Sequence, residues 1–332
     1  LSNELGREKV PAVPADRRQA RSKGDMDWDP SHVENLILQA LAEDIGPGDA
    51  TVAATIPAHA IGRAHIVAKQ DLVCAGLPLA ESVFHSLDPQ MKLERHAEEG
   101  QLVHKGHDLL HLDGKASAIL TGERTALNFL GRLSGIATLT HQFVEQLAGS
   151  RAKMRDTRKT TPGLRLLEKY AVKMGGGANH RIGLYDAILL KENHIALAGG
   201  VKAALDQAHS YASSHVSPRA TTAYEAVGQI PSHSEAASLP IQIEVRNAAE
   251  LREALSAGAA AVLLDNMTPD RARACVQIAQ GIRPDCVVEI SGGITLANAR
   301  AYAETGADYL SSGALTHSAP NADMSLLVDS LQ

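Results

Sequence analysis

The sequence predicts an α/β protein in which a smaller α+β sandwich domain precedes a TIM-like parallel α/β barrel, closed or incomplete. From residue 151 onward, short apolar runs alternate with segments of helical periodicity, the pattern of repeated βα units with buried parallel strands. Before that point, apolar and polar residues alternate around glycines, as in antiparallel hairpins. Aromatic residues make up only 3% of the chain, so Ala, Leu, Val and Ile must fill the tightly packed layers.

The bulk composition limits the partners and the compartment. A length of 332 residues allows one large or two medium domains. The net charge of −6 argues against general nucleic-acid binding. No stretch approaches the roughly 18 apolar residues of a membrane span. The three cysteines lack metal or redox spacing, so we expect reduced thiols in a cytoplasmic protein: Cys74, Cys275 and Cys286.

The first part of the chain divides into a leader and a small domain. Residues 1–26 are polar and lack an apolar core, so they are interpreted as a flexible leader and not as a signal peptide. Residues 27–150 are assigned to the α+β domain and its connecting helices. Its expected elements are a helix over 33–45, a strand over 64–68, a helix over 78–87, hairpin strands within 91–112 and a helical region over 117–149.

Three histidines in the hairpin region, His104, His107 and His111, raise the question of a metal site. No cysteine or matching carboxylate accompanies them at a metal-binding spacing. Solvated loop histidines are therefore favoured over metal ligands.

The second part, residues 151–315, is expected to form the barrel. The strand candidates are 187–190, 241–245, 261–264, 287–290 and 308–310, and the helix candidates between them are 248–257, 269–280 and 296–305. Residues 210–239 are rich in Ser, Pro and His and exceed an ordinary link, so they are interpreted as a surface insertion, with a regulatory or oligomer contact as the alternative. The last segment, residues 316–332, is apolar enough to pack back on the small domain.

Polar residues recur at the ends of the predicted barrel strands, about one βα unit apart: Glu244, Asp265, Ser291 and Ser312. The carboxyl ends of barrel strands carry the chemistry of such folds. Two of these positions open Gly-rich loops, Ser291-Gly292-Gly293 and Ser312-Gly313-Ala314. Backbone amides in such loops can hold phosphate.

A basic stretch from Arg155 to His194 is the strongest functional signal. It holds eight Lys and Arg residues against four acids, and several stand beside Gly, Pro, Thr or Asn. Cations on loops behind apolar strands predict a pocket for a polyanion. The alternative is a solvated basic face, which is the usual interpretation of an isolated charge run.

The same stretch resembles the quinolinate phosphoribosyltransferase family, also called nicotinate-nucleotide pyrophosphorylase (carboxylating). The matching motifs are Asp156-Thr-Arg-Lys-Thr-Thr-Pro-Gly-Leu-Arg165, Glu168-Lys-Tyr-Ala171, Gly175-Gly-Gly177 and Asn179-His-Arg181, with Glu123-Arg-Thr125 and Ser134-Gly-Ile-Ala-Thr138 before them. The resemblance runs from about Leu36 to His317. The segment 210–239 departs from it.

The resemblance implies a role for each site residue. Quinolinate would be bound by Arg158, His180, Arg181 and Lys191, together with Arg124 from the neighbouring subunit of a homodimer or higher oligomer with shared active sites. Lys159, Glu244 and Asp265 would be the catalytic residues. The phosphoribosyl pyrophosphate site would comprise these three and Thr157, Ser291, Gly292, Gly293, Ser312, Gly313, Ala314 and His317.

The implied reaction transfers a phosphoribosyl group to quinolinate and releases pyrophosphate and CO₂, giving nicotinate mononucleotide in de novo NAD biosynthesis. Mg²⁺ would be held mainly by the substrate, near Glu244 and Asp265, without a dedicated protein cage. Guanidinium groups suit the two carboxylates of quinolinate because they donate paired hydrogen bonds.

Three alternatives stay open at this point. Lys191 ends an apolar strand, where the lysine of a Schiff-base aldolase can sit. A related phosphoribosyltransferase-like barrel could take another acceptor. A non-catalytic nucleotide or phosphate sensor could use the same barrel, although Glu244 and Asp265 are both present.

Overall fold

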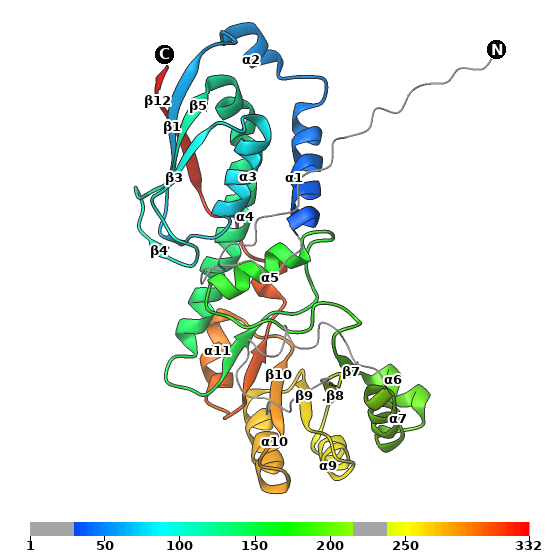
Figure 1. Cartoon of the computed structure of the whole chain (residues 1–332). Helices are drawn as coiled ribbons and strands as arrows, with labels where there is room; N and C mark the ends of the chain where they lie inside the picture. Colours follow the sequence, from blue (N-terminus) through cyan, green and yellow to red (C-terminus); the bar gives the residue numbers. More distant parts are fainter. Residues whose placement is uncertain (1–29, 215–237, 332) are drawn as a thin grey trace, which may run out of the picture.

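The computed structural model of the chain describes residues 30–214 and 238–331. The predicted leader, residues 1–26, and most of the predicted insertion within 210–239 therefore lie outside the described residues. The described chain forms two units that are stacked along one long helix, with the small sheet at one end and the parallel sheet at the other (Figure 1). Among these residues, no helix has both the length and the hydropathy needed to cross a lipid bilayer.

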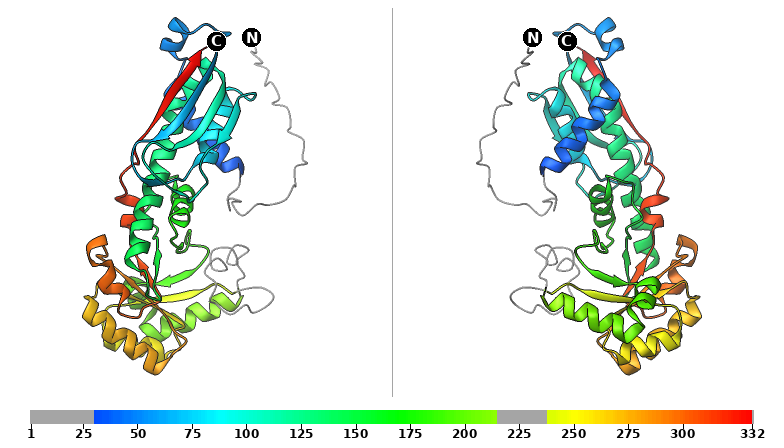
Figure 2. Two further views of the ribbon diagram at one scale, coloured as in Figure 1. Left: turned by 90° about the vertical axis from the view of Figure 1, so that its left-hand side faces the viewer. Right: turned by 90° about the vertical axis from the view of Figure 1, so that its right-hand side faces the viewer.

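The small unit is built on an antiparallel sheet with the strand order β12-β1-β5-β3. Helices α1, α3 and α4 cover one face of the sheet (Figure 2). Two further short strands pair with each other, and a short helix joins α1 to β1. The elements are α1 (Pro30–Ile45), α2 (Ala50–Thr55), β1 (Ile61–Ala68), β2 (Leu72–Val73), α3 (Leu77–Leu87), β3 (Lys92–Arg95), β4 (Leu102–Val103) and β5 (Asp108–Lys115).

The end of the chain returns to the small unit. Strand β12 (Met324–Leu331) runs antiparallel to β1, from the pair Ala68 and Met324 to the pair Gly62 and Leu331. Met324 and Leu326 are buried, whereas Leu327 is 46% exposed. Successive side chains of a strand point to opposite faces, so one face of β12 packs against the protein and the other faces solvent. Figure 1 shows β12 in red beside β1 in blue.

Helix α4 (Ala116–Gln146) connects the two units. Its 31 residues span about 45 Å at the usual rise per residue. Other backbone segments approach it closely at glycines: a Cβ at Gly135 would lie 1.9 Å from the carbonyl oxygen of Pro320. A Cβ at Gly175 would lie 2.3 Å from the carbonyl oxygen of Ala137 in α4. The absence of a side chain at Gly135 therefore lets the C-terminal segment lie directly against this helix.

The large unit is a parallel sheet with the strand order β6-β11-β10-β9-β8-β7. Its strands are β6 (Lys153–Arg155), β7 (Ile188–Leu190), β8 (Ile241–Val245), β9 (Ala261–Asp265), β10 (Val287–Ser291) and β11 (Tyr309–Ser311). The helices are α5 (Arg165–Met174), α6 (Glu192–Ala198), α7 (Val201–Ser214), α9 (Ala248–Ser256), α10 (Pro269–Ile282), α11 (Leu296–Ala303) and α12 (Ala314–His317). Within the described ranges, β6 and β7 do not pair with each other, and a single parallel bridge joins Arg155 to Ala178 beyond β6. The predicted fold class is confirmed, and the barrel is incomplete.

The two faces of β12 provide a stability test. We expect Leu326→Ala to lower the free energy of unfolding by about 2–4 kcal/mol, because it removes buried methyl groups and leaves a cavity. Leu327→Ala, the matched control on the exposed face, should change it by less than about 0.5 kcal/mol. Urea denaturation followed by circular dichroism measures both values. Equal losses in the two variants would contradict the orientation of this strand.

Candidate active site

The predicted site residues gather at one end of the parallel sheet. The chain leaves β6 into Asp156 and Thr157, β7 into Lys191, and β9 into Asn266. The Gly-rich loops follow β10 and β11. Because parallel strands have their carboxyl ends at the same edge, these segments meet there even though they are far apart in the sequence.

The loops after β9 and β10 pack directly against each other. Asn266 has a positive φ of 52°, and its Nδ2 donates to Asp265 Oδ2 at 2.8 Å. A Cβ at Gly292 would lie 2.2 Å from Asn266 Oδ1, so a residue with a side chain at 292 would collide with the neighbouring loop. The hydroxyl of Ser312 donates to the carbonyl of Ile294 at 2.9 Å and ties the third loop to the second. Asp265, Gly292 and Ser312 are thus brought together.

Lys159 lies across Gly313. Its Cδ would be 2.8 Å from a Cβ at that position, and ring atoms of His317 would be 3.0 Å away. The hydroxyl of Thr316 donates to the carbonyl of Lys159 at 2.8 Å, which fixes the loop after β6 against the start of α12. A cationic side chain beside a glycine whose backbone stays accessible is an arrangement that suits a phosphate group.

A buried carboxylate holds the loop that carries Arg158 and Lys159. Glu168 is fully buried and accepts from Arg132 Nη2 at 2.7 Å, from Thr161 N at 3.0 Å and from Thr161 Oγ1 at 2.8 Å. Arg165 Nε donates a hydrogen bond to Thr160 Oγ1 in the same loop, at 3.0 Å. The Nε atom of Arg158 is buried without a hydrogen-bond partner among the described residues.

The segment from Asn179 to Arg181 rests on a buried ion pair between Lys169 and Asp156. Asp156 Oδ1 accepts from the amide of His180 at 2.8 Å, and Lys169 Nζ donates to the carbonyl of His180 at 2.9 Å. Burial raises the pKa of Asp156 to about 6 and lowers the pKa of Lys169, although each partner opposes the shift of the other. Arg181 is only 6% exposed, and its Nη1 donates to the carbonyl of Ala187 at 3.0 Å.

Lys191 and Glu244 form an ion pair of 2.9 Å between Nζ and Oε2. The resemblance had given these residues different roles, one toward the acceptor and one toward the ribose or metal. A Schiff-base lysine is activated by burial in an apolar pocket or by a neighbouring cation. The side chain of Lys191 is 51% exposed and faces an anion, so the structure gives no support to the aldolase alternative.

Arg124 lies apart from this cluster. It is exposed on α4, and among the described residues it has no hydrogen bond or ion pair. Arg132, eight residues further along the same helix, contacts Glu168 and the carbonyls of Thr316 and Ala319. At the usual rise, Arg124 is about 12 Å farther from the parallel sheet along the helix axis.

Three residues beneath the loops were missed by the sequence analysis: Gln242, Glu289 and Ser311. Glu289 in β10 is fully buried and accepts from Arg155 Nη1 at 2.7 Å, from Gln242 Nε2 at 3.0 Å and from the hydroxyl of Ser311. Burial by itself would raise the pKa of Glu289, but attraction to His180 and Arg155 and the hydrogen bonds outweigh it and bring the pKa to about 2. A charged residue within the apolar run Val287 to Ile290 was the signal that could have revealed this cluster.

Among the described residues, no group of three or more His, Cys, Asp or Glu side chains is arranged to hold a metal ion. The three histidines of the hairpin region contact separate partners: His104 contacts Asp71, His107 the carbonyl of His96, and His111 Asp108. These contacts leave no common centre at which the three rings meet.

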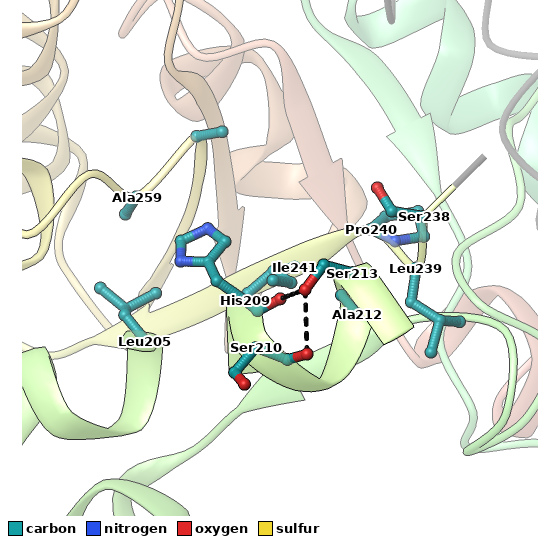
Figure 3. A pocket seen from close by; sticks show the side chains of 11 residues that line it. Leu205, His209, Ser210, Ala212, Ser213, Ser238, Leu239, Pro240, Ile241 and Ala259 are labelled. Carbon is teal, nitrogen blue, oxygen red and sulfur yellow. Dashed lines mark hydrogen bonds between the residues drawn. The ribbon is translucent and has the colours of Figure 1, made fainter. Parts of the chain in front are cut away.

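Cavities occur at both ends of the parallel sheet. One of about 200 Å³ adjoins the site and is lined by Glu192, Glu244, Arg246 and Glu250, among others. Another, of about 580 Å³, lies between α7 and the residues that precede β8 and β9, and contains none of the predicted site residues (Figure 3). It is at the amino ends of the strands, so we place the chemistry at the opposite end, where the polar residues converge.

Comparisons with known proteins point to one family. Residues 49–134 match the N-terminal domain of quinolinate phosphoribosyl transferase, and residues 136–227 and 219–327 match its C-terminal domain. A probable nicotinate-nucleotide pyrophosphorylase (carboxylating) of Bacillus subtilis is 39% identical over 89% of this chain and 92% of its own length. A quinolinate phosphoribosyltransferase (decarboxylating) of Nicotiana tabacum is 37% identical over 90% and 82%. The solved nicotinate-nucleotide pyrophosphorylase of Francisella tularensis superposes with a TM-score of 0.80, at 35% identity, over 92% of this chain and 98% of that one.

Two adjacent glycines allow the loop after β10 to be tested. Gly292 and Gly293 both have positive φ, 96° and 66°, so alanine is strained at either position. Only a Cβ at Gly292 would collide with Asn266, because nothing lies within 4 Å of a Cβ at Gly293. We expect Gly292→Ala to weaken the binding of ribose 5-phosphate at least about tenfold and Gly293→Ala to weaken it less. Isothermal titration calorimetry measures both, and equal affinities would contradict the proposed packing of the loops.

Proposed function

The chain belongs to the quinolinate phosphoribosyltransferase family, and from this we propose that it transfers the phosphoribosyl group of phosphoribosyl pyrophosphate to quinolinate. Pyrophosphate and CO₂ leave, and nicotinate mononucleotide, a precursor of NAD, is the product. The observation that supports this most directly is the convergence of two kinds of anion site at one sheet edge. Lys159 lies over the Gly313 loop, and Arg158 and Arg181 lie on the two loops that Arg165 and Lys169 hold together.

The acceptor site is assigned to the arginines. Quinolinate carries two adjacent carboxylates, and planar guanidinium groups bind carboxylates through paired hydrogen bonds. Arg158 has a buried Nε without a partner among the described residues, which leaves it able to donate to an anion. Arg181 approaches from the neighbouring loop with one N–H fixed on Ala187.

The donor site is assigned to the loops after β6, β10 and β11. The 5′-phosphate suits the amides of Gly292, Gly293 and Gly313, and the pyrophosphate suits Lys159 and His317. Thr157, Ser291, Ser312 and Ala314 border the same space at the strand ends. Glu244 and Asp265 come from the adjacent ends of β8 and β9, where a carboxylate can face the ribose.

The reaction then needs little covalent participation from the protein. The bond between ribose C1′ and pyrophosphate breaks, and the departing oxygens keep the electron pair beside Lys159. The carboxylates stabilise the positive charge that develops on the ribose, and the pyridine nitrogen forms the new bond to C1′. The ring nitrogen becomes cationic and stabilises the electron pair that stays on the adjacent ring carbon when its carboxylate leaves as CO₂. A proton from solvent then bonds to that carbon.

A magnesium ion fits this site only as a companion of the donor. Glu244 is paired with Lys191 and Asp265 accepts from Asn266, so neither carboxylate is part of a protein cage for a metal. Mg²⁺ keeps most of its coordination from phosphate oxygens and water in such sites. When bound, it would neutralise the pyrophosphate as that group departs.

We further propose that the working unit is a homodimer with shared sites. Arg124 lies on α4 about 12 Å farther from the parallel sheet than Arg132, apart from the other site residues. Two large apolar side chains follow Arg181 on an exposed loop, Leu184 at 71% and Tyr185 at 53% exposure. A second copy that covers this loop would shield them from water and could bring its own Arg124 to the quinolinate, and in a two-fold interface each subunit would give one arginine and receive one.

An assay of pyrophosphate release tests the function and the acceptor site together. The wild type should release pyrophosphate only with quinolinate, phosphoribosyl pyrophosphate and Mg²⁺ all present. Arg158→Ala should raise the KM for quinolinate roughly 10- to 150-fold, since it removes a charge-assisted contact worth about 1.5–3 kcal/mol. The KM for the donor should change far less.

Arg63→Ala is the control for Arg158, because Arg63 is an exposed arginine on the small sheet, where it pairs with the half-buried Asp113. An unchanged KM for quinolinate in Arg158→Ala would remove Arg158 from the acceptor site. Absence of quinolinate-dependent turnover in the wild type would overturn the function itself.

Complementation tests the shared site. Arg124→Ala and Lys191→Ala should each be nearly inactive, because each removes one of the cations of every site. A heterodimer of the two variants has one site with both defects and one site with neither, if Arg124 acts across the interface. Activity should therefore recover toward half that of one wild-type dimer.

Heterodimers must be isolated by two affinity tags so that their formation is established separately. With heterodimers in hand, no recovery of activity would place Arg124 in the site of its own subunit or outside the chemistry.

A further inference from the structure

His180 uses every one of its polar atoms within the chain. Its amide donates to Asp156 at 2.8 Å, and its carbonyl accepts from Lys169 at 2.9 Å. Its Nδ1 lies 2.7 Å from the amide nitrogen of Arg181, and its Nε2 lies 3.2 Å from Gln242 Oε1. The ring is buried, with 7% of the residue exposed. A substrate ligand usually keeps at least one polar atom available, and His180 keeps none.

The direction of each hydrogen bond around this ring follows from Glu289. An ionised carboxylate only accepts, so the amide nitrogen of Gln242 must face Glu289 Oε2, at 3.0 Å. The amide oxygen of Gln242 then faces His180, and an amide oxygen also only accepts. The imidazole proton therefore sits on Nε2, and Nδ1 is the acceptor for the amide of Arg181. The result is a directed chain from the Arg181 amide through His180 and Gln242 to Glu289.

A protonated ring would disrupt this chain. Imidazolium carries a proton on both nitrogens, so Nδ1–H would face the N–H of Arg181 at 2.7 Å. Burial lowers the pKa of His180 to about 4, and the nearby charges of Arg155, Lys169 and Arg181 add to this effect, while Glu289 opposes it. The ring is therefore neutral at neutral pH, and a neutral ring adds no charge to a carboxylate site.

We propose that His180 is a positioning residue, held as the Nε2–H tautomer by Gln242 and Glu289, that fixes the backbone of Arg181 and so places the guanidinium for the acceptor carboxylate. This rests on the proposed function and revises the role that the resemblance implied for His180, that of a direct quinolinate ligand. Gln242 and Glu289 thereby become specificity residues for the acceptor without touching it. The hydrogen bond from Arg181 Nη1 to the carbonyl of Ala187 holds the other end of the Arg181 side chain.

The tautomer can be observed directly. Full-length wild-type protein with ¹⁵N-labelled histidine rings should show, in long-range ¹H–¹⁵N spectra at pH 7, a neutral His180 with a protonated Nε2. The signal is assigned by its loss in His180→Asn. Its pattern should stay unchanged when quinolinate is added. An imidazolium, an Nδ1–H tautomer, or a switch of tautomer on adding quinolinate would overturn the proposal.

Kinetics of Gln242→Leu test the consequence. Leucine fills a similar volume but ends the hydrogen-bond chain, so the KM for quinolinate should rise about tenfold and the KM for the donor should stay within about twofold. Thr305→Val is the matched control, because it removes a buried hydrogen bond to Tyr302 at the end of α11, away from the site. It should leave both constants unchanged.

The outcomes separate the two proposals. If the wild type turns over quinolinate, and Gln242→Leu is folded but has the wild-type KM for quinolinate, the positioning role is wrong and the proposed function is retained. If the wild type fails to turn over quinolinate, the function falls, and the NMR result still decides the tautomer. Should Gln242→Leu fail to fold, the NMR measurement on the wild type remains the deciding one.

Discussion

Two ion pairs buried beneath the barrel mouth, Arg155 with Glu289 and Lys169 with Asp156, set the constraint on which the site depends. A charge removed from water costs several kcal/mol unless a partner and hydrogen bonds compensate it. Glu289 can be compensated only if β6, β8, β10 and β11 are in their observed register, because its partners come from those strands. Asp156 requires α5 and the segment before β7 to be placed as well. The loops above cannot shift far without leaving a buried charge unpaired.

This rigidity has a direct use in the proposed chemistry. Cations that must bind a dianion repel one another when the site is empty, so they need to be held in place by other groups. Arg181 is held through His180 and Ala187, and the loop of Arg158 is held through Thr161 and Glu168. A site whose donors are already oriented loses little free energy to reorganisation when charge develops. The buried pairs therefore fix the geometry of the loops that carry these cations.

Sequence patterns predicted the helices and strands whose formation depends on residues that are close together in the chain. The strand over Ile241–Val245 and the helices after β8, β9 and β10 follow from apolar runs and helical periodicity. Strand β6 was not predicted because Lys153–Arg155 has three residues and a charge at each end. Its place is fixed by pairing with β11, more than 150 residues later, which no local pattern reveals. The pairing of Lys191 with Glu244 and the chain from Arg181 to Glu289 depend in the same way on which strands are neighbours.

The charges of the site accord with the proposed sharing of residues between two subunits. The basic stretch from Arg155 to His194 looked rich in cations, but Lys169, Lys191 and Arg155 are each paired with a carboxylate of the same chain. Within the described residues, no ion pair joins Arg158 or Lys159 to a carboxylate, so these two keep their charge for a ligand. Quinolinate brings two negative charges, and the phosphorylated donor brings several more. In the proposed function, Mg²⁺ bound to the donor and a cation from the second subunit supply the remaining positive charge. Arg124, which the proposed dimer would supply from its second subunit, is exposed and has no such partner among the described residues.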